Sequence, residues 1–236
     1  MTGAAKRIGR AIALDLAGRG MGVVVHYGGS ADEARELVRE IEAAGGRAWA
    51  AQADLADRQA AAELAGTARE LAGRLDVLVN NASMFPKSTV LDFEPEELFA
   101  NVDVNALAPL LLSRALARQQ GEAAIVNLLD TRIVSYDREH AAYHLSKRML
   151  HTITRMLALE LAPRIRVNAV APGVILPPPG KDEAYLEELR HTNPLNSIGD
   201  PADIARAAAY LLEAPFVTGQ VVYVDGGRHM LGGAYA

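Results

Sequence analysis

Short apolar runs alternate with longer helical segments along nearly the whole of this chain. The apolar runs have the length of buried strands, and the segments between them carry Ala, Leu, Glu and Arg at helical spacing. The expected strands lie at 23–26, 47–52, 77–79, 124–128, 166–170 and 221–224, and the expected helices at roughly 8–20, 31–44, 57–73, 95–119, 140–162 and 201–213. This alternation predicts an α/β fold with a doubly wound parallel sheet.

Size and composition set limits on what the chain can do. It has 236 residues, of which 50% are hydrophobic and only 5% are aromatic, so we expect one domain over residues 1–236 with a core of Ala, Val and Leu. The net charge is −5 and no basic run exceeds two residues, which argues against a nucleic-acid surface. We therefore expect a small-molecule substrate.

The absence of cysteine excludes disulfides, thiolate catalysis and zinc sites with Cys ligands. His140, His144 and His151 could face one side of a helix, but no acidic partner completes a metal-binding spacing, so we expect no metal. Neither a signal peptide nor an apolar run of ~18 residues is visible. We expect a cytoplasmic protein without a membrane partner.

Capping residues support several helix boundaries. Ser30 and Glu33 have the spacing of a capping box. Glu94 and Asp200 each precede a proline, which suits a first helical position. These positions predict helix starts near 31, 95 and 201.

A glycine pattern at the start of the chain indicates a dinucleotide site. Thr2, Gly3 and Gly9 form TGxxxxxG, in which helix N-terminal N–H groups face an anion, and Arg7 adds a cation beside them. Such a loop normally follows a buried strand, yet only Met1 precedes it. We therefore expect the first, central strand of the sheet to be truncated here, through a misplaced start site or a shortened chain.

The residues after the run at 23–26 predict which cofactor binds. An enzyme that uses NAD usually places an acid there for the ribose 2′-hydroxyl, and an acid would repel a 2′-phosphate. No acid occurs from His26 to Ser30, while Asp32 and Glu33 are explained by their place in the first helical turn. With Arg7, His26 and the helix N-terminus at Ser30 nearby, this pattern favours NADPH.

Polar or small residues also follow two later runs. Asn80, Asn81, Ala82 and Ser83 come after the run at 77–79, where they could form a simple turn or let a cofactor approach the backbone closely. Pro172 and Gly173 end the run at 166–170. The segment 174–195, which contains three consecutive prolines at 177–179, has the length of a lid.

Tyr143 and Lys147 lie four residues apart in the expected helix 140–162, with Asp130 upstream at the end of an apolar run. Residues at i and i+4 share one helix face, so an ammonium group here would lower the pKa of the phenol. The alternative interpretation is that Tyr143 and Lys147 form an ordinary i,i+4 pair on the protein surface. In the helix before them, Pro109 lacks the N–H that would bond to the Asn105 carbonyl, so we expect that carbonyl to hold a water on a proton path from Lys147.

Together, in this order and over essentially the whole chain, these motifs resemble the short-chain dehydrogenase/reductase family, which has a Rossmann fold. The resemblance implies that Tyr143 donates a proton, that Lys147 lowers its pKa and binds the nicotinamide ribose, and that Asn105 positions a relay water. It implies a homotetramer. The cofactor contacts that it implies also include Gly3, Ile8, Asp54, Leu55, Asn81, Ala82, Ser83, Pro172, Gly173 and Val174.

Other residues are similar to the pteridine reductase subgroup, which includes bacterial dihydromonapterin reductases. That subgroup has a GAAKR-type loop, an NNAS turn, an aromatic residue shortly after it, and an aspartate in place of the family's catalytic serine. This chain has GAAKR at 3–7, NNAS at 80–83, Phe85 and Asp130. By this resemblance Phe85 would stack on a pterin, and Arg7 and Ser83 would contact pterin or cofactor phosphate.

We therefore predict an NADPH-dependent reductase of pteridines that takes hydride from the nicotinamide and a proton from Tyr143, with Asp130 at the substrate. Two alternatives remain: a short-chain reductase of another carbonyl or imine, and a non-catalytic NADP(H)-sensing regulator. The presence of Tyr143, Lys147 and Asn105 argues against the regulator. Asp130 could also act only by orienting Tyr143.

Overall fold

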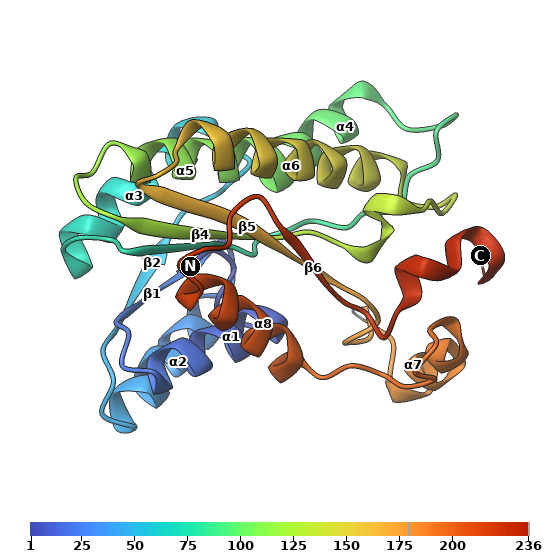
Figure 1. The fold of residues 1–236 in the computed structure, drawn as a ribbon, viewed down its shortest axis with the longest axis horizontal. Helices are drawn as coiled ribbons and strands as arrows, with labels where there is room; N and C mark the ends of the chain where they lie inside the picture. The colour runs from blue at the N-terminus through green and yellow to red at the C-terminus, as the bar shows by residue number, and fades with distance from the viewer. Residues whose placement is uncertain (179, 236) are drawn as a thin grey trace.

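A computed structural model describes residues 1–178 and 180–235, which form parallel strands with helices on both faces (Figure 1). Pro179 of the proline run lies outside the described residues. The strands are β1 (Val23–Tyr27), β2 (Ala48–Gln52), β3 (Val77–Asn80), β4 (Ala123–Leu128), β5 (Ile165–Pro172) and β6 (Val221–Val224). The α-helices are α1 (Arg7–Gly18), α2 (Ala31–Ala43), α3 (Arg58–Ala72), α4 (Pro95–Val102), α5 (Ala108–Ala117), α6 (Ala141–Glu160), α7 (Glu183–Leu189) and α8 (Pro201–Glu213). These elements confirm the predicted α/β fold.

The two layers of helices bury opposite faces of the same strands. Helices α1, α2 and α8 lie on one face, and α3, α4, α5 and α6 lie on the other (Figure 1). In β4, Ile125 packs into the core under α6, while its neighbour Val126 packs into the core under α1 and α8. Because successive strand residues point to opposite faces, a strand covered on both sides is apolar throughout. Burying each such side chain fully contributes about 1.5–3 kcal/mol.

The strands form two separate parallel sheets, one of β1 and β2 and one ordered β3-β4-β5-β6. No strand among the described residues lies between β1 and β3. Instead, Met1 and Thr2 bridge the carboxyl ends of these strands: His26 N–H donates to the Met1 carbonyl (3.1 Å) and Thr2 N–H donates to the Val79 carbonyl (2.9 Å). Met1 and Thr2 therefore connect β1 with β3 only at the carboxyl ends of these strands.

A cavity of about 370 Å³ occupies the rest of the space between β1 and β3. Its apolar lining includes Leu16, Val24, Ala68, Val79 and Leu112. The apolar side chains around it lose packing contacts that a filled core would supply.

Of two expectations about helix ends, one is confirmed and one is wrong. Asp200 caps α8 as predicted, since its carboxylate accepts from Ala202 N–H (2.7 Å). Ser30 makes no side-chain cap bond, so the capping box predicted there is wrong. The reason is that the Glu33 carboxylate pairs instead with the ammonium group of Lys6, at 2.5 Å.

The segment expected as one helix from 95 to 119 is divided. A π-helical turn, η1 (Asp103–Leu107), separates α4 from α5. Pro109 has no N–H for an i→i−4 bond, and the backbone accommodates this by widening one turn. Short 3₁₀ turns lie at η2 (Thr131–Val134), η3 (Arg190–Thr192) and η4 (Arg228–Tyr235).

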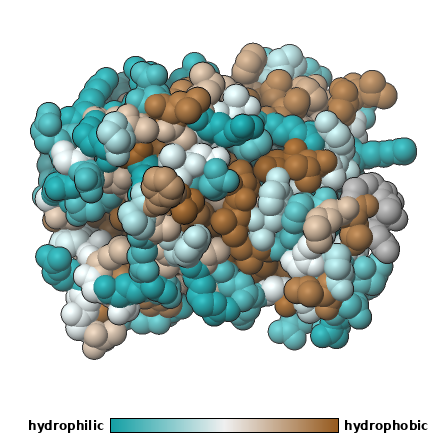
Figure 2. Space-filling model, viewed as in Figure 1, coloured by the Kyte–Doolittle hydropathy of each residue, from teal (hydrophilic) through white to brown (hydrophobic). Residues whose placement is uncertain are grey.

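The edge strand β6 is apolar but only half-buried along its whole length. Figure 2 shows hydrophobic side chains gathered over the middle of this face, in the region of β6. Within the described residues, no helix is both long and apolar enough to cross a membrane.

Candidate functional site

The glycine loop and the turn after β3 form one backbone unit. Asn81 N–H donates to the Thr2 hydroxyl (3.0 Å), and the Asn81 side-chain amide donates to the Gly3 carbonyl (2.8 Å). Gly3 has a φ of +57°, and a Cβ there would come within 2.9 Å of the Ala82 Cα. A Cβ on Gly9 would overlap the Gly3 carbonyl oxygen. Only glycines allow this close approach, which leaves an open cradle of backbone groups at the start of α1.

His26 lies near the carboxyl end of β1 and is one of the residues from which the sequence analysis favoured NADPH. It is buried, and its Nδ1 accepts from Gly3 N–H (3.1 Å). The proton is therefore on Nε2, which donates to the Ala53 carbonyl (3.1 Å). Burial lowers the pKa of His26 to about 4. His26 therefore supplies no positive charge for a cofactor phosphate at neutral pH, because the ring is neutral and both nitrogens are bonded within the protein.

The other predicted cofactor residues lie around this cradle. The Arg7 guanidinium donates to the Pro177 carbonyl (2.8 Å), so it reaches the segment predicted as a lid. Asp54 is exposed after β2, while Leu55 beside it is buried. Ile8 is half-buried in the first turn of α1.

The proposed proton donor contacts the unusual aspartate directly. The Tyr143 hydroxyl donates to Asp130 Oδ2 (2.9 Å), while Asp130 Oδ1 accepts from Arg132 N–H (2.7 Å). Burial and the nearby Asp130 carboxylate raise the pKa of Tyr143 well above its usual value. The net shift is therefore opposite to the one expected from Lys147 alone, because burial and Asp130 outweigh the effect of a nearby ammonium group. Tyr143 holds its proton firmly as a neutral phenol.

The ammonium group of Lys147 lies near the ring of Tyr143. Its ammonium group donates to the Leu128 carbonyl (2.8 Å) and is 5.7 Å from the centroid of the Tyr143 ring. Burial lowers the pKa of Lys147 to about 8, and the Asp130 carboxylate opposes this shift. The ammonium group is thus mostly charged at neutral pH but close to losing its proton.

Asn105 joins the turn after β3 to α6. Its side-chain oxygen accepts from Met84 N–H (2.9 Å) and from the Ser83 hydroxyl (3.1 Å), and its amide donates to Ser146 Oγ (2.9 Å). Sequence analysis did not select Ser146. Its position three residues after Tyr143, on the same helix face, was the available signal.

The carboxyl ends of β5 and β6 close the other side of the site. Gly173 N–H donates to the Val224 carbonyl (3.0 Å), and a Cβ at Gly173 would come within 2.6 Å of Asp225. Pro172 ends β5, and the Val174 carbonyl accepts from Gly199 N–H (3.1 Å). The predicted residues at 172–174 therefore lie at the same sheet edge as the turn after β3.

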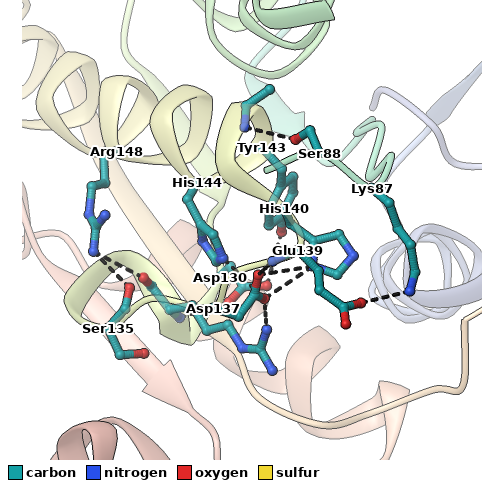
Figure 3. A network of polar contacts seen from close by, with 12 residues as sticks. Lys87, Ser88, Asp130, Ser135, Asp137, Glu139, His140, Tyr143, His144 and Arg148 are labelled. Carbon is teal, nitrogen blue, oxygen red and sulfur yellow. Dashed lines mark hydrogen bonds and ion pairs between the residues drawn. The ribbon is translucent and has the colours of Figure 1, made fainter. Parts of the chain in front are cut away.

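Phe85 contacts the predicted proton donor, Tyr143. Its ring makes a T-shaped contact with Tyr143, with centroids 4.6 Å apart, and stacks on His140 at 3.9 Å. Asp137 accepts from Arg132 and lies 3.1 Å from His140 Nδ1 (Figure 3). Neither His140 nor Asp137 was selected from sequence as a functional residue, although His140 is three residues before Tyr143.

The histidines weighed as metal ligands have other contacts. His140 and His144 both lie against Asp137 (Figure 3), with His144 Nε2 at 3.2 Å from its carboxylate. In the part of the chain that the structure describes, no three His, Asp or Glu side chains gather as they would around a metal ion.

Comparisons with known proteins agree with this geometry. The model of a family described as enoyl-(acyl carrier protein) reductase matches residues 3–229. An uncharacterized oxidoreductase from Mycobacterium tuberculosis is 36% identical, covering 96% of this chain and 90% of that protein. A 3-oxoacyl-[acyl-carrier-protein] reductase from Synechocystis is 35% identical, covering 98% and 96%. The crystal structure of FolM alternative dihydrofolate reductase 1 from Brucella canis, complexed with NADP, has a TM-score of 0.91 at 34% identity, covering 97% and 92%.

Proposed function

Because the chain belongs to the short-chain dehydrogenase/reductase family, we propose that it uses NADPH to reduce pteridines, from the dihydropterin to the tetrahydropterin level. The observation that carries this proposal is the hydrogen bond from Tyr143 to Asp130, made beside the exposed ring of Phe85. A pterin is planar and has amide- and guanidine-like edges, so a stacking ring next to a carboxylate suits it better than it suits a small ketone. The similarity to a protein named as an alternative dihydrofolate reductase supports the same substrate class.

The proposed cofactor fits the cradle formed by the glycine loop. A Cβ at Gly3 would come within 2.9 Å of the Ala82 Cα, so glycine is needed to hold the loop in this position at the start of α1, where helix N–H groups can face an anion. No acidic residue lies from His26 to Ser30 to repel a 2′-phosphate. When bound, NADPH would supply the hydride, and Lys147 and the residues at 172–174 would hold its nicotinamide end.

The protein's own side chains account for the proton. Tyr143 retains its proton at neutral pH because burial and Asp130 raise its pKa, so it can act as a general acid towards a ring nitrogen. The charge of Lys147 stabilises the phenolate that remains after transfer. Asn105 keeps Ser83 and Met84 in place beside the substrate and is proposed to hold the relay water.

The alternative is reduction of another carbonyl or imine, which the 3-oxoacyl reductase relative favours. A cofactor-sensing regulator without turnover is a third candidate. Cofactor oxidation assayed with dihydrobiopterin, dihydromonapterin and a panel of small ketones separates all three. We expect turnover of the dihydropterins. Turnover of ketones alone would favour the alternative, and binding of NADPH without any turnover would favour the regulator.

Cofactor choice is tested separately by titrating NADPH and NADH. We expect the wild type to bind NADPH more tightly than NADH. If the Arg7 guanidinium makes a charge-assisted bond to the cofactor phosphate, Arg7→Ala should bind NADPH more weakly than the wild type by about 1–3 kcal/mol. Arg206→Ala, on the exposed surface of α8, is the matched control. Equal or tighter binding of NADH would contradict the assignment.

The assembly is proposed to be a homotetramer. The half-buried apolar edge strand β6 supports association between copies, because strands at sheet edges are normally covered or charged. Light scattering at several protein concentrations would test this, and a monomer throughout would contradict it.

A further inference from the structure

One face of Phe85 is already covered. The imidazole of His140 stacks on it with an interplanar angle of 12° and a centroid distance of 3.9 Å, while Tyr143 makes a T-shaped contact with it. The residue nevertheless remains 47% exposed. The ring therefore has a backing on one side and a contact with Tyr143, and about half of the residue's surface stays open.

Several bonds hold His140 in this position. Its Nδ1 is 3.1 Å from Asp137 Oδ2, and Asp137 is in turn paired with Arg132 (Figure 3). The backbone on either side of His140 is joined to the segment that carries Phe85: Ser88 N–H donates to the Glu139 carbonyl (2.6 Å), and Ala141 N–H donates to the Ser88 carbonyl (2.9 Å).

A side-chain pair reinforces this junction. The Lys87 ammonium group lies 2.6 Å from the Glu139 carboxylate (Figure 3). The pair is exposed and contributes little by itself, but it connects the same two segments as the backbone bonds. The two aromatic rings therefore sit on segments that are fixed to each other.

His140 supplies a flat surface without an added charge. Burial and the neighbouring Arg132 guanidinium lower the pKa of His140 below its usual value. This direction favours the uncharged imidazole at neutral pH, in which one ring nitrogen can donate to the Asp137 carboxylate. A neutral ring stacked at this distance restricts rotation of Phe85 without repelling a cationic substrate ring.

We propose that His140 is a positioning residue for substrate affinity: by backing Phe85, it fixes that ring as the platform on which a flat heteroaromatic substrate stacks. The inference rests on the proposed pteridine substrate and extends it to a residue that takes no part in proton transfer. The Ser88 bonds set the position of the backbone that carries the imidazole, and the imidazole sets the plane of Phe85.

The test compares His140→Leu with His140→Phe, using dihydrobiopterin and saturating NADPH. Leucine fills space without a flat face, whereas phenylalanine keeps the stack without the bond to Asp137. We expect His140→Leu to raise KM for dihydrobiopterin by about 3- to 10-fold with kcat retained, and His140→Phe to restore KM. His151→Leu, on the same helix, is the matched control.

Each result has a distinct consequence. An unchanged KM in His140→Leu, or a loss in kcat alone, would overturn the platform role, as would failure of His140→Phe to restore KM. Wild-type turnover of dihydrobiopterin tests the proposed function independently of the variants. If the wild type does not turn over dihydropterins, the proposed function fails, and the platform inference fails with it.

Discussion

The two halves of the split sheet use polar side chains differently. In the half formed by β1 and β2, His26 is tied to backbone groups at both nitrogens and stays neutral. In the half formed by β3 to β6, Tyr143 and Asp130 bond to each other beside the buried ammonium group of Lys147. The first arrangement fixes the backbone of a cradle, and the second keeps a proton on the Tyr143 hydroxyl, from which the proposed reaction would take it. Substitutions should therefore affect stability in the first half and rate in the second.

The largest effect is expected in the second half. Tyr143→Phe removes the general acid, so kcat should fall by about 10²–10⁴-fold while NADPH affinity changes little. Steady-state kinetics with dihydrobiopterin and a cofactor titration measure the two quantities. Tyr210→Phe, on the exposed side of α8, should behave as wild type. If kcat fell as much in Tyr210→Phe as in Tyr143→Phe, the loss could not be assigned to the half of the sheet formed by β3 to β6.

His26 should make the first half sensitive to acid. In the unfolded chain a histidine gains its proton near pH 6.5, whereas folded His26 does so only near pH 4. Its contribution to stability is therefore complete above pH 6.5 and declines as the pH falls towards 4, by about 3 kcal/mol. Urea unfolding at several pH values would measure this in wild type and in His26→Gln. The variant should be less stable at neutral pH but lose less on acidification; parallel curves would contradict the account.

The cavity between the halves provides a smaller test. Ala68 lines it, so Ala68→Leu should add packing and raise the free energy of unfolding by about 1–2 kcal/mol. Ala208 of α8 is fully buried in the core that α8 shares with α1. Ala208→Leu should overpack this core and lower the free energy of unfolding by about 1–3 kcal/mol. Thermal unfolding of the wild type and both variants measures the two changes in stability. Destabilisation by both substitutions would mean that the cavity cannot accept a larger side chain.

Periodicity and local spacing predicted much of the fold and the centre of the site. The strands appeared within one or two residues of their expected positions, because parallel strands covered on both faces are apolar runs. The spacing of Tyr143 and Lys147 placed both side chains on the buried face of α6. Pro109 predicted a helix defect at Asn105, and the structure has a π-helical turn there.

Interactions between distant segments could not be predicted in the same way. Glu33 pairs with Lys6 rather than capping at Ser30, and His26 bonds to Gly3, since both partners are brought close only by the fold. The raised pKa of Tyr143 likewise depends on burial and on which oxygen its hydroxyl meets. Local sequence sets which groups are available, whereas tertiary contacts decide their charge.

The most direct test of the account is the role of Asp130 in substrate choice. The measurement is the ratio of kcat/KM for dihydropterin to kcat/KM for a small ketone, in wild type and in Asp130→Ser. Serine can accept a hydrogen bond from Tyr143 but has no carboxyl group to share a proton with a pterin nitrogen. We predict that the ratio falls by about tenfold, with ketone turnover retained. An unchanged ratio would mean that Asp130 only orients Tyr143, and would contradict a pterin site built on this carboxylate.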